Sequence, residues 1–169
     1  AWKRAHFMMP ALARMGEKRL VPIGLDIGPS DCTLSVRPHF LAPVPDSHKY
    51  RRGLLAIVAG KMPGAPLLSA KAAMRSGAGY VKLLSDHSHP DAPAELVVAD
   101  DPLDRALADE RIDAILIGPG PGRDETASQR LSAVLAAGRP IVLDADALHM
   151  LTPDLLGARA ETPLIMTPH

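Results

Sequence analysis

Four short segments of the sequence carry residues whose types suit chemistry on a phosphate or a hydroxyl group. They read "GKMPGA", "GPGPGRD", "DADALH" and "TPH", and each follows an apolar run. The third holds two carboxylates, Asp144 and Asp146, which would share one face of a strand because they are two residues apart. Such acids bind a cation, orient a hydroxyl or cap a helix N-terminus, and the sequence leaves the three roles open. Arg123, in the second segment, suits a phosphate.

Two familiar phosphate-binding motifs do not fit these segments. Gly60-Lys61 is followed by Met62, and Leu55 stands where a P-loop requires its first glycine. "GPGPG" comes nearest to the dinucleotide fingerprint, but its two prolines lack the N–H groups that would approach a pyrophosphate. "MPGAP" precedes a helical pattern, so free amides and the positive end of a helix dipole would lie there. A tight turn without a ligand remains an equal interpretation of "MPGAP" and of "GPGPGRD".

The spacing of apolar residues predicts the elements that must position these segments. Strands are expected at 53–60, 78–85, 94–100, 112–120, 139–148 and 162–169, and helices at 65–77, 102–110 and 125–138. Pro66 suits the first turn of the first helix, and Gly77 suits its C-cap. Continuous apolar strands that alternate with helices predict an α/β fold, with a mostly parallel sheet and helices on both faces. Ligands of such sheets bind at the carboxyl ends of the strands, where all four segments fall.

Composition narrows the possible partners. The chain has 169 residues, 47% of them hydrophobic but 3% aromatic, so we expect a core of aliphatic side chains. Its formal net charge of +0 argues against a nucleic-acid partner. No apolar run reaches the roughly 18 residues that span a bilayer, and charges interrupt the N-terminal segment where a secretory signal would be apolar. We therefore expect a cytoplasmic protein without a membrane partner.

Cysteine and histidine offer little for chemistry. Cys32 is the sole cysteine, so an internal disulfide and a cysteine metal cluster are excluded, and we expect a partly buried thiol. His87 and His89 lie in "SDHSHPD", whose polar composition favours a surface loop over a metal site. No metal site is predicted from these residues.

The first 45 residues differ from the rest. "RLVPIGLDIGPS" suggests a short strand that ends at Gly28-Pro29, and the prolines of "RPHFLAPVP" favour the extended backbone of a linker. No helix or strand pattern here is long enough to form a domain by itself.

Four motifs together resemble the ADP/ATP-dependent NAD(P)H-hydrate dehydratases, which are ribokinase-like proteins. The motifs are "HKYRRGLLAIVAGKMPGAPLLSAKAAMRSGAGYVKL", "GPGPGRD", "PIVLDADAL" and "LIMTPH", in the family's order and rough spacing over residues 48–169. The resemblance implies a three-layer fold, a hydrated nicotinamide nucleotide (NAD(P)H hydrate) as substrate, ADP or ATP, Mg²⁺, and a homo-oligomer. In bifunctional members an epimerase domain comes first. The resemblance thus implies that residues 1–45 are the end of such a domain plus a linker, and residues 46–169 the first part of the dehydratase domain.

The resemblance also implies a substrate site and its limits. The six residues carried over by position are Gly64, Ala65, Gly120, Asp144, Asp146 and His169, with the two acids at the floor near the transferred phosphate. Family members continue into a nucleotide-binding stretch and a Gly-x-Gly-Asp motif with the catalytic aspartate. Catalytic residues are therefore expected beyond His169, and the chain is expected to be truncated and unable to complete the reaction alone.

Departures from the family pattern fall beside the expected site. The loop between Gly60 and Met62 is shorter than in the family, and Pro66, Pro121 and His149 replace an alanine, a leucine and an asparagine. Two alternatives stay open: a ribokinase-like kinase of a small alcohol or vitamin precursor, and a non-catalytic nucleotide-binding fragment. "MPGAP" together with "DADAL" favours the dehydratase.

Overall fold

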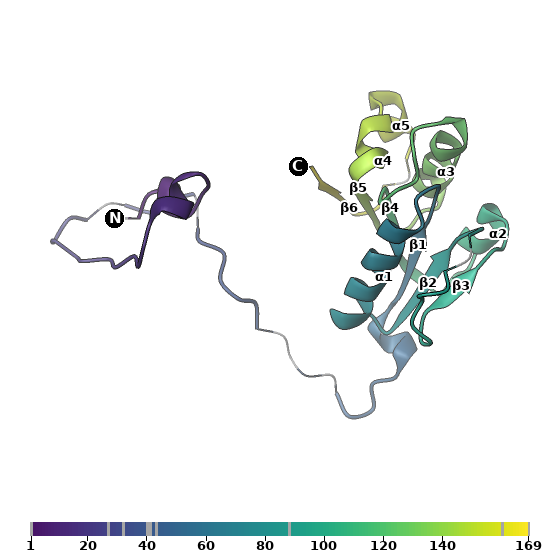
Figure 1. The fold of residues 1–169 in the computed structure, drawn as a ribbon, viewed down its shortest axis with the longest axis horizontal. Coiled ribbons are helices and arrows are strands. Elements are labelled where there is room, and N and C mark those ends of the chain that lie inside the picture. Colours follow the sequence, from purple (N-terminus) through teal and green to yellow (C-terminus); the bar gives the residue numbers. More distant parts are fainter. Residues whose placement is uncertain are drawn as a thin grey trace. The chain divides into compact units, whose positions relative to one another are not determined.

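The chain divides into two compact units, Ala1–Ala42 and Pro43–His169 (Figure 1). The computed structural model describes residues 2–26, 28–31, 33–39, 42, 44–87, 89–159 and 161–168. In the described part of the first unit the regular elements are two 3-10 helices, η1 (Arg4–His6) and η2 (Ala11–Arg14). The strand expected before Gly28-Pro29 is not formed, because the described residues of this unit supply no second strand for it to pair with. Cys32 lies outside the described residues.

The second unit is built on a six-stranded sheet in which all neighbours are parallel. The strands are β1 (Leu54–Val58), β2 (Tyr80–Leu84), β3 (Val97–Ala99), β4 (Ile112–Ile117), β5 (Ile141–Asp144) and β6 (Leu164–Thr167). Their order is β3-β2-β1-β4-β5-β6. The chain moves outward from β1 through β2 to β3, then returns to the other side of β1 with β4. The strand order therefore reverses between β1 and β4, which is the topological switch point of the sheet.

Helices cover both faces of this sheet and make three layers, as predicted (Figure 1). On one face, α1 (Gly64–Arg75) buries Leu67 and Ala70 against Ile57 and Leu83. The other face packs against α2 (Leu103–Leu107), α3 (Glu125–Ala136), α4 (Ala145–Met150) and α5 (Pro153–Ala158). A short 3-10 helix, η3 (Lys49–Arg52), leads into β1. No helix formed by the described residues is long and apolar enough to cross a membrane.

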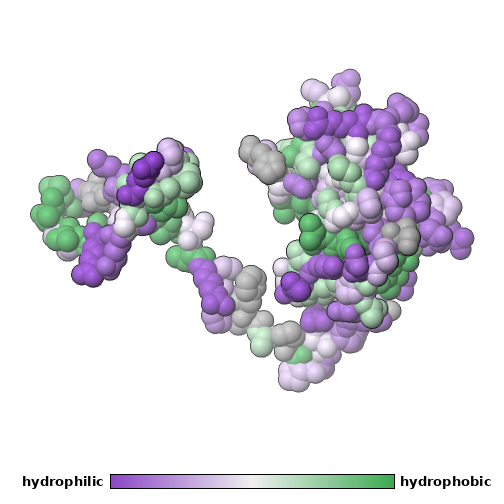
Figure 2. All heavy atoms as spheres, in the orientation of Figure 1, coloured by the Kyte–Doolittle hydropathy of each residue, from purple (hydrophilic) through white to green (hydrophobic). Residues whose placement is uncertain are grey.

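The α1 face is less completely covered toward β6. Ile57, Leu116, Val142 and Ile165 form one row across the sheet, because their strands pair in that register. Exposure along the row rises from 0% at Ile57 to 60% at Ile165. In Figure 2 hydrophilic residues cover most of the visible face of the second unit, with apolar residues between them. Ile165 and Met166 of β6 are among the exposed apolar side chains, as are Leu68 and Met62. β6 is an edge strand of the sheet.

Local sequence explains how α1 begins and ends. Pro66 lies in its first turn, where a missing N–H costs no helical hydrogen bond. At the other end Gly77 has a φ of 105°. The N–H of Ala78 donates to the carbonyl of Ala73 at 3.1 Å and that of Gly77 to Met74 at 3.3 Å. These two bonds form a Schellman motif, which confirms Gly77 in the capping position.

Each observed strand lies within its predicted range and is shorter than that range, and one predicted strand runs into a helix. The expected strand 139–148 ends at Asp144, and residues 145–148 belong to α4. Ala145 has a φ of 42°, which turns the backbone out of the extended conformation. β4 ends at Ile117, the partner of Leu143, so the residues after Asp144 have no strand beside them on that side.

Glycine is required where the ends of β4 and β5 meet. Gly118 has a φ of 128°, and a Cβ atom built on it would lie 1.8 Å from the carbonyl oxygen of Asp144. Gly138 also has a positive φ, of 67°, but a Cβ there meets nothing within 4 Å. Both glycines have a positive φ, but only Gly118 is closely packed, so comparing substitutions at the two positions separates the cost of the backbone conformation from the cost of a clash.

We expect Gly118→Ala to destabilise the chain much more than Gly138→Ala. The change at Gly138 costs about 1 kcal/mol for the positive φ. The change at Gly118 adds a clash with the backbone of Asp144, worth at least about 2 kcal/mol more. Urea unfolding of both variants and the parent measures the difference. Equal losses of unfolding free energy would show that the ends of β4 and β5 are not in this contact.

Candidate functional site

The loops that follow β1 and β4 interlock at the switch point. The N–H of Met62, in the first loop, donates to the carbonyl of Gly120, in the second, at 3.0 Å. A Cβ atom on Gly60 would lie 2.2 Å from the Cα of Pro121. Residue 60 must therefore be glycine for the two loops to touch. The contact places the short Gly60–Met62 loop directly on the "GPGPG" segment.

The interlocked loops bring predicted site residues together. Gly120 has a φ of 74°, and a Cβ on it would lie 2.9 Å from the Cβ of Met62 and 3.5 Å from that of Ala65. Gly64 is the first residue of α1, and the N-cap residue Pro63 makes no side-chain capping bond. Gly64, Ala65 and Gly120 thus form one wall beside the uncapped N-terminus of α1, at the carboxyl edge of the sheet.

The two predicted acids lie at the same edge but do not share a strand face. Asp144 ends β5, and its Oδ1 accepts a hydrogen bond from the hydroxyl of Thr167 at 2.7 Å. Asp146 lies in the first turn of α4, and its Oδ1 accepts from Nε of Arg123 at 2.8 Å. The expectation of a shared strand face is wrong, because α4 begins at Ala145. Neither acid caps that helix through its side chain.

The sixth predicted site residue, His169, lies outside the described residues. Thr167, two residues earlier, is described, and its hydroxyl donates to the carboxylate of Asp144 at 2.7 Å and lies 3.2 Å from the carbonyl oxygen of Leu143. The end of β6 therefore reaches the same edge as the other predicted residues. The sequence does not indicate Thr167 as a site residue, because nothing near a threonine at the end of a strand shows that its hydroxyl will bond to a distant aspartate.

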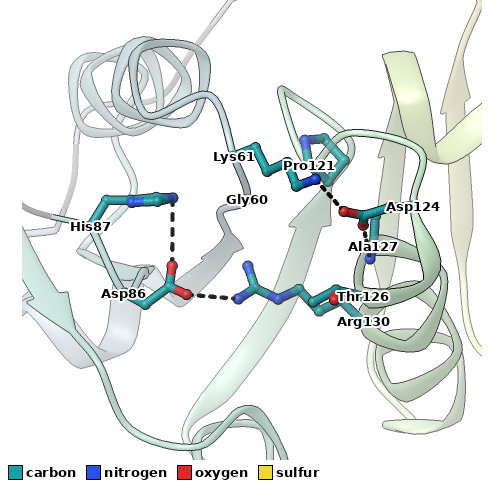
Figure 3. A pocket seen from close by; sticks show the side chains of 9 residues that line it. All are labelled: Gly60, Lys61, Asp86, His87, Pro121, Asp124, Thr126, Ala127 and Arg130. Carbon is teal, nitrogen blue, oxygen red and sulfur yellow. Dashed lines mark hydrogen bonds and ion pairs between the residues drawn. The ribbon is translucent and has the colours of Figure 1, made fainter.

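A cleft of about 160 Å³ opens on the α3 side of the interlocked loops (Figure 3). It is lined by Gly60, Lys61, Asp86, His87, Pro121, Asp124, Thr126, Ala127 and Arg130. Two ion pairs cross it: Lys61 with Asp124 at 2.5 Å, and Arg130 with Asp86 at 3.2 Å. Asp124 also caps α3, accepting from the N–H of Ala127 at 2.9 Å. The aspartate directly before a helical pattern was the sequence signal for this cap.

The Lys61–Asp124 contact has an electrostatic consequence. The hydrogen bond from the Lys61 ammonium, with the N–H of Ala127 second, holds the pKa of Asp124 below its ordinary value. A hydrogen bond from Arg111 likewise lowers the pKa of Asp109 to about 2, far from the site. Both carboxylates are therefore ionised throughout the neutral range.

Several polar side chains in the described part of the loop after β2 contact one another, while Asp86 also pairs with Arg130 of α3. Ser85 Oγ lies 2.8 Å from Nε2 of His89 and accepts the N–H of His87 at 3.1 Å. His87 lies 3.7 Å from Asp86. Among the described residues no group of three or more histidine, cysteine, aspartate and glutamate side chains is arranged to hold a metal ion.

The fold and this edge define a class of protein: an α/β protein with a parallel sheet and a cleft at its switch point. A family model for NAD(P)H-hydrate dehydratase matches residues 55–169. The bifunctional NAD(P)H-hydrate repair enzyme Nnr of Mycobacterium tuberculosis is 34% identical over 170 residues, covering 94% of this chain and 35% of that protein. The ADP-dependent (S)-NAD(P)H-hydrate dehydratase of Neisseria meningitidis is 37% identical over 145 residues, covering 78% and 48%.

Solved structures agree with these relatives. The ADP/ATP-dependent NAD(P)H-hydrate dehydratase of Bacillus subtilis, co-crystallised with ATP and Mg²⁺, matches with a TM-score of 0.60 and 34% identity over 76% of this chain and 48% of that one. A ribokinase-like superfamily protein of Enterococcus faecalis matches with a TM-score of 0.65 and 29% identity, over 76% and 49%. The chain belongs to the NAD(P)H-hydrate dehydratase family and has its ribokinase-like fold. It spans about a third to a half of the length of these relatives.

We expect Lys61→Met to raise the pKa of Asp124 toward its ordinary value, because the ammonium hydrogen bond is lost. It should stay somewhat low, since the N–H of Ala127 still donates. A carboxylate with a lowered folded pKa stabilises the fold above its unfolded pKa of about 4, and this contribution fades as pH falls. The stability advantage of the parent over Lys61→Met should therefore disappear in acid.

Carbon-detected NMR titration of the side-chain carboxyl groups measures both pKa values. Asp109 serves as the internal control, because its main partner Arg111 is untouched. An unchanged pKa of Asp124 in Lys61→Met would contradict the ion pair.

Proposed function

We propose that the chain carries the substrate-binding part of an ADP/ATP-dependent (S)-NAD(P)H-hydrate dehydratase. The observation that carries the proposal is the wall formed by Gly120 and Ala65 beside the N-terminus of α1. The wall lies at the switch point, where sheets of this kind bind ligands. Membership of the dehydratase family gives the site its substrate class.

The wall suits a flat, bulky nucleotide. Gly120 packs without a side chain against Met62 and Ala65, and Ala65 adds only one methyl group, so little side-chain bulk stands between a ring and the backbone at this edge. The first-turn amides of Gly64 and Ala65 have no capping side chain. Together with the positive end of the α1 dipole they suit an anionic group of the substrate.

Asp144 and Asp146 suit contacts with the substrate hydroxyl and with the phosphoryl group that would be transferred to it. Thr167 engages Oδ1 of Asp144, and Oδ2 has no partner among the described residues. A carboxylate held in this way could orient the substrate hydroxyl or serve as a ligand of Mg²⁺. Asp146 is neutralised by Arg123, and a phosphoryl group that arrives at this edge would compete for the same guanidinium.

The proposed reaction replaces a poor leaving group with a good one. ATP or ADP supplies a phosphoryl group to the hydroxyl oxygen of the hydrated ring. The C–O bond then breaks with help from the ring nitrogen lone pair, a proton leaves, and NAD(P)H and phosphate result. The chain contributes positioning and fixed charges to this chemistry. We assign the nucleotide clamp and the catalytic residues to the part of the relatives that this chain does not span.

The domain assignment is part of the same proposal. We assign residues 1–45 to the end of an epimerase domain and a linker, and residues 46–169 to the dehydratase domain. The match to the bifunctional M. tuberculosis enzyme over 94% of this chain supports this assignment. A cytoplasmic location, a homo-oligomer and the absence of a nucleic-acid partner stay predictions from the sequence.

We expect Ala65→Leu to weaken binding of (S)-NADH hydrate about tenfold or more, because a larger side chain at the start of α1 would project into the space proposed for the substrate. Isothermal titration calorimetry with the purified 169-residue chain measures the dissociation constant. Ala136→Leu, on the exposed side of α3, is the matched control and should bind like the parent.

The same titration tests the alternatives. A folded parent chain that does not bind NADH hydrate, or that binds a small vitamin alcohol more tightly, would contradict the proposal. Equal affinities of the Ala65→Leu variant and the parent would contradict the position of the wall.

A further inference from the structure

Arg130 connects three elements at the switch point from the α3 side. It projects from the second turn of α3, and its side chain is 23% exposed. Its Nη1 donates to the carbonyl oxygen of Ala59 at 2.5 Å, and its Nη2 pairs with Asp86 at 3.2 Å. Figure 3 shows the guanidinium directed at Asp86 across the cleft. One side chain thus joins α3 to the carboxyl ends of both β1 and β2.

The carbonyl of Ala59 needs such a donor. Ala59 is 0% exposed, and its own N–H donates to the carbonyl of Leu84 at 2.9 Å. Pairing between β1 and β4 ends one residue earlier, at Val58 and Ile117. The carbonyl of Ala59 is therefore buried but lies beyond the hydrogen-bonded pairing of β1 with β4. A buried carbonyl without a donor is unfavourable, and a charged donor makes the stronger bond.

This peptide is where the interlocked loops begin. Gly60 follows Ala59 and lies against Pro121, where no Cβ atom would fit. Two residues later the N–H of Met62 bonds to Gly120. A rotation of the peptide after Ala59 would move Gly60 against Pro121 and break the register between the two loops. The position of the Gly120 wall therefore depends on the carbonyl that Arg130 holds.

We propose that Arg130 is a positioning residue of the candidate site. It fixes the last peptide of β1 and so sets the wall of Gly120 and Ala65, although it lies on the opposite face of the sheet from α1. Asp86 pairs with Nη2 and holds the guanidinium in place, while Nη1 donates to the carbonyl of Ala59. The effect on substrate rests on the proposed function, whereas the effect on the loops does not.

The test compares Arg130→Met with Arg105→Met. Arg105 is an exposed arginine on α2, so its replacement controls for the loss of one charge. Hydrogen exchange of the Met62 amide, followed by NMR, reports the contact with Gly120 directly. We expect exchange at least about tenfold faster in Arg130→Met than in the parent, and unchanged in Arg105→Met. The amide of Ala78, at the far end of α1, should keep its rate in both variants.

Binding gives the second readout. At a temperature where urea titration shows each variant fully folded, Arg130→Met should bind (S)-NADH hydrate about tenfold more weakly. Arg130→Lys retains one donor to Ala59 and should recover part of both effects. A lower unfolding free energy with unchanged Met62 exchange and unchanged affinity would overturn the proposal, since Arg130 would then be structural support alone. If the parent chain binds no NADH hydrate, the proposed function fails, while Met62 exchange still decides the role of Arg130.

Discussion

Two loops leave the same edge of the sheet at the point where the strand order reverses, and their contact is the constraint on which the site depends. β1 and β4 are neighbours, but the helices that follow them lie on opposite faces. The two loops lie against each other before they part, and we call this contact the crossing. Backbone lies directly on backbone there, since Gly60 has no room for a Cβ against Pro121. The hydrogen bond from Met62 to Gly120 then fixes the distance between the start of α1 and the "GPGPG" segment.

Ion pairs hold this crossing from the outside. Lys61 joins the first loop to the start of α3, Arg123 joins the second loop to α4, and Arg130 joins α3 to the end of β2. Exposed pairs of this kind contribute little to stability. Each one, however, links a loop or strand end to a helix that is anchored in the core. These ion pairs therefore help to position the loops at the carboxyl edge of the sheet, because burial of apolar side chains alone does not fix those positions.

The sequence predicted the sheet and most of the helices because their signals are local. Continuous apolar runs gave the strands, and Pro66 and Gly77 marked the ends of α1. The end of β5 was missed because "DADAL" alternates like a strand, whereas what stops it is the end of β4 at Ile117. The hydrogen bond between Arg130 and Ala59 joins residues that are 71 positions apart, so no local sequence pattern indicates it. Of the predicted site residues, the small ones were placed side by side, while Asp146 proved to lie on a helix.

The two sides of the crossing differ in what they offer a ligand. On the α3 side, Lys61 and Arg130 each have a carboxylate partner, and Asp124 fills the N-terminus of its helix. That side is electrostatically satisfied and holds little attraction for an anion. On the α1 side the helix N-terminus has no capping side chain, and the wall beside it is glycine and alanine. If the proposed function holds, a negatively charged nucleotide should therefore enter from the α1 side, and the charged residues of the α3 side should affect its binding only through the backbone that they position.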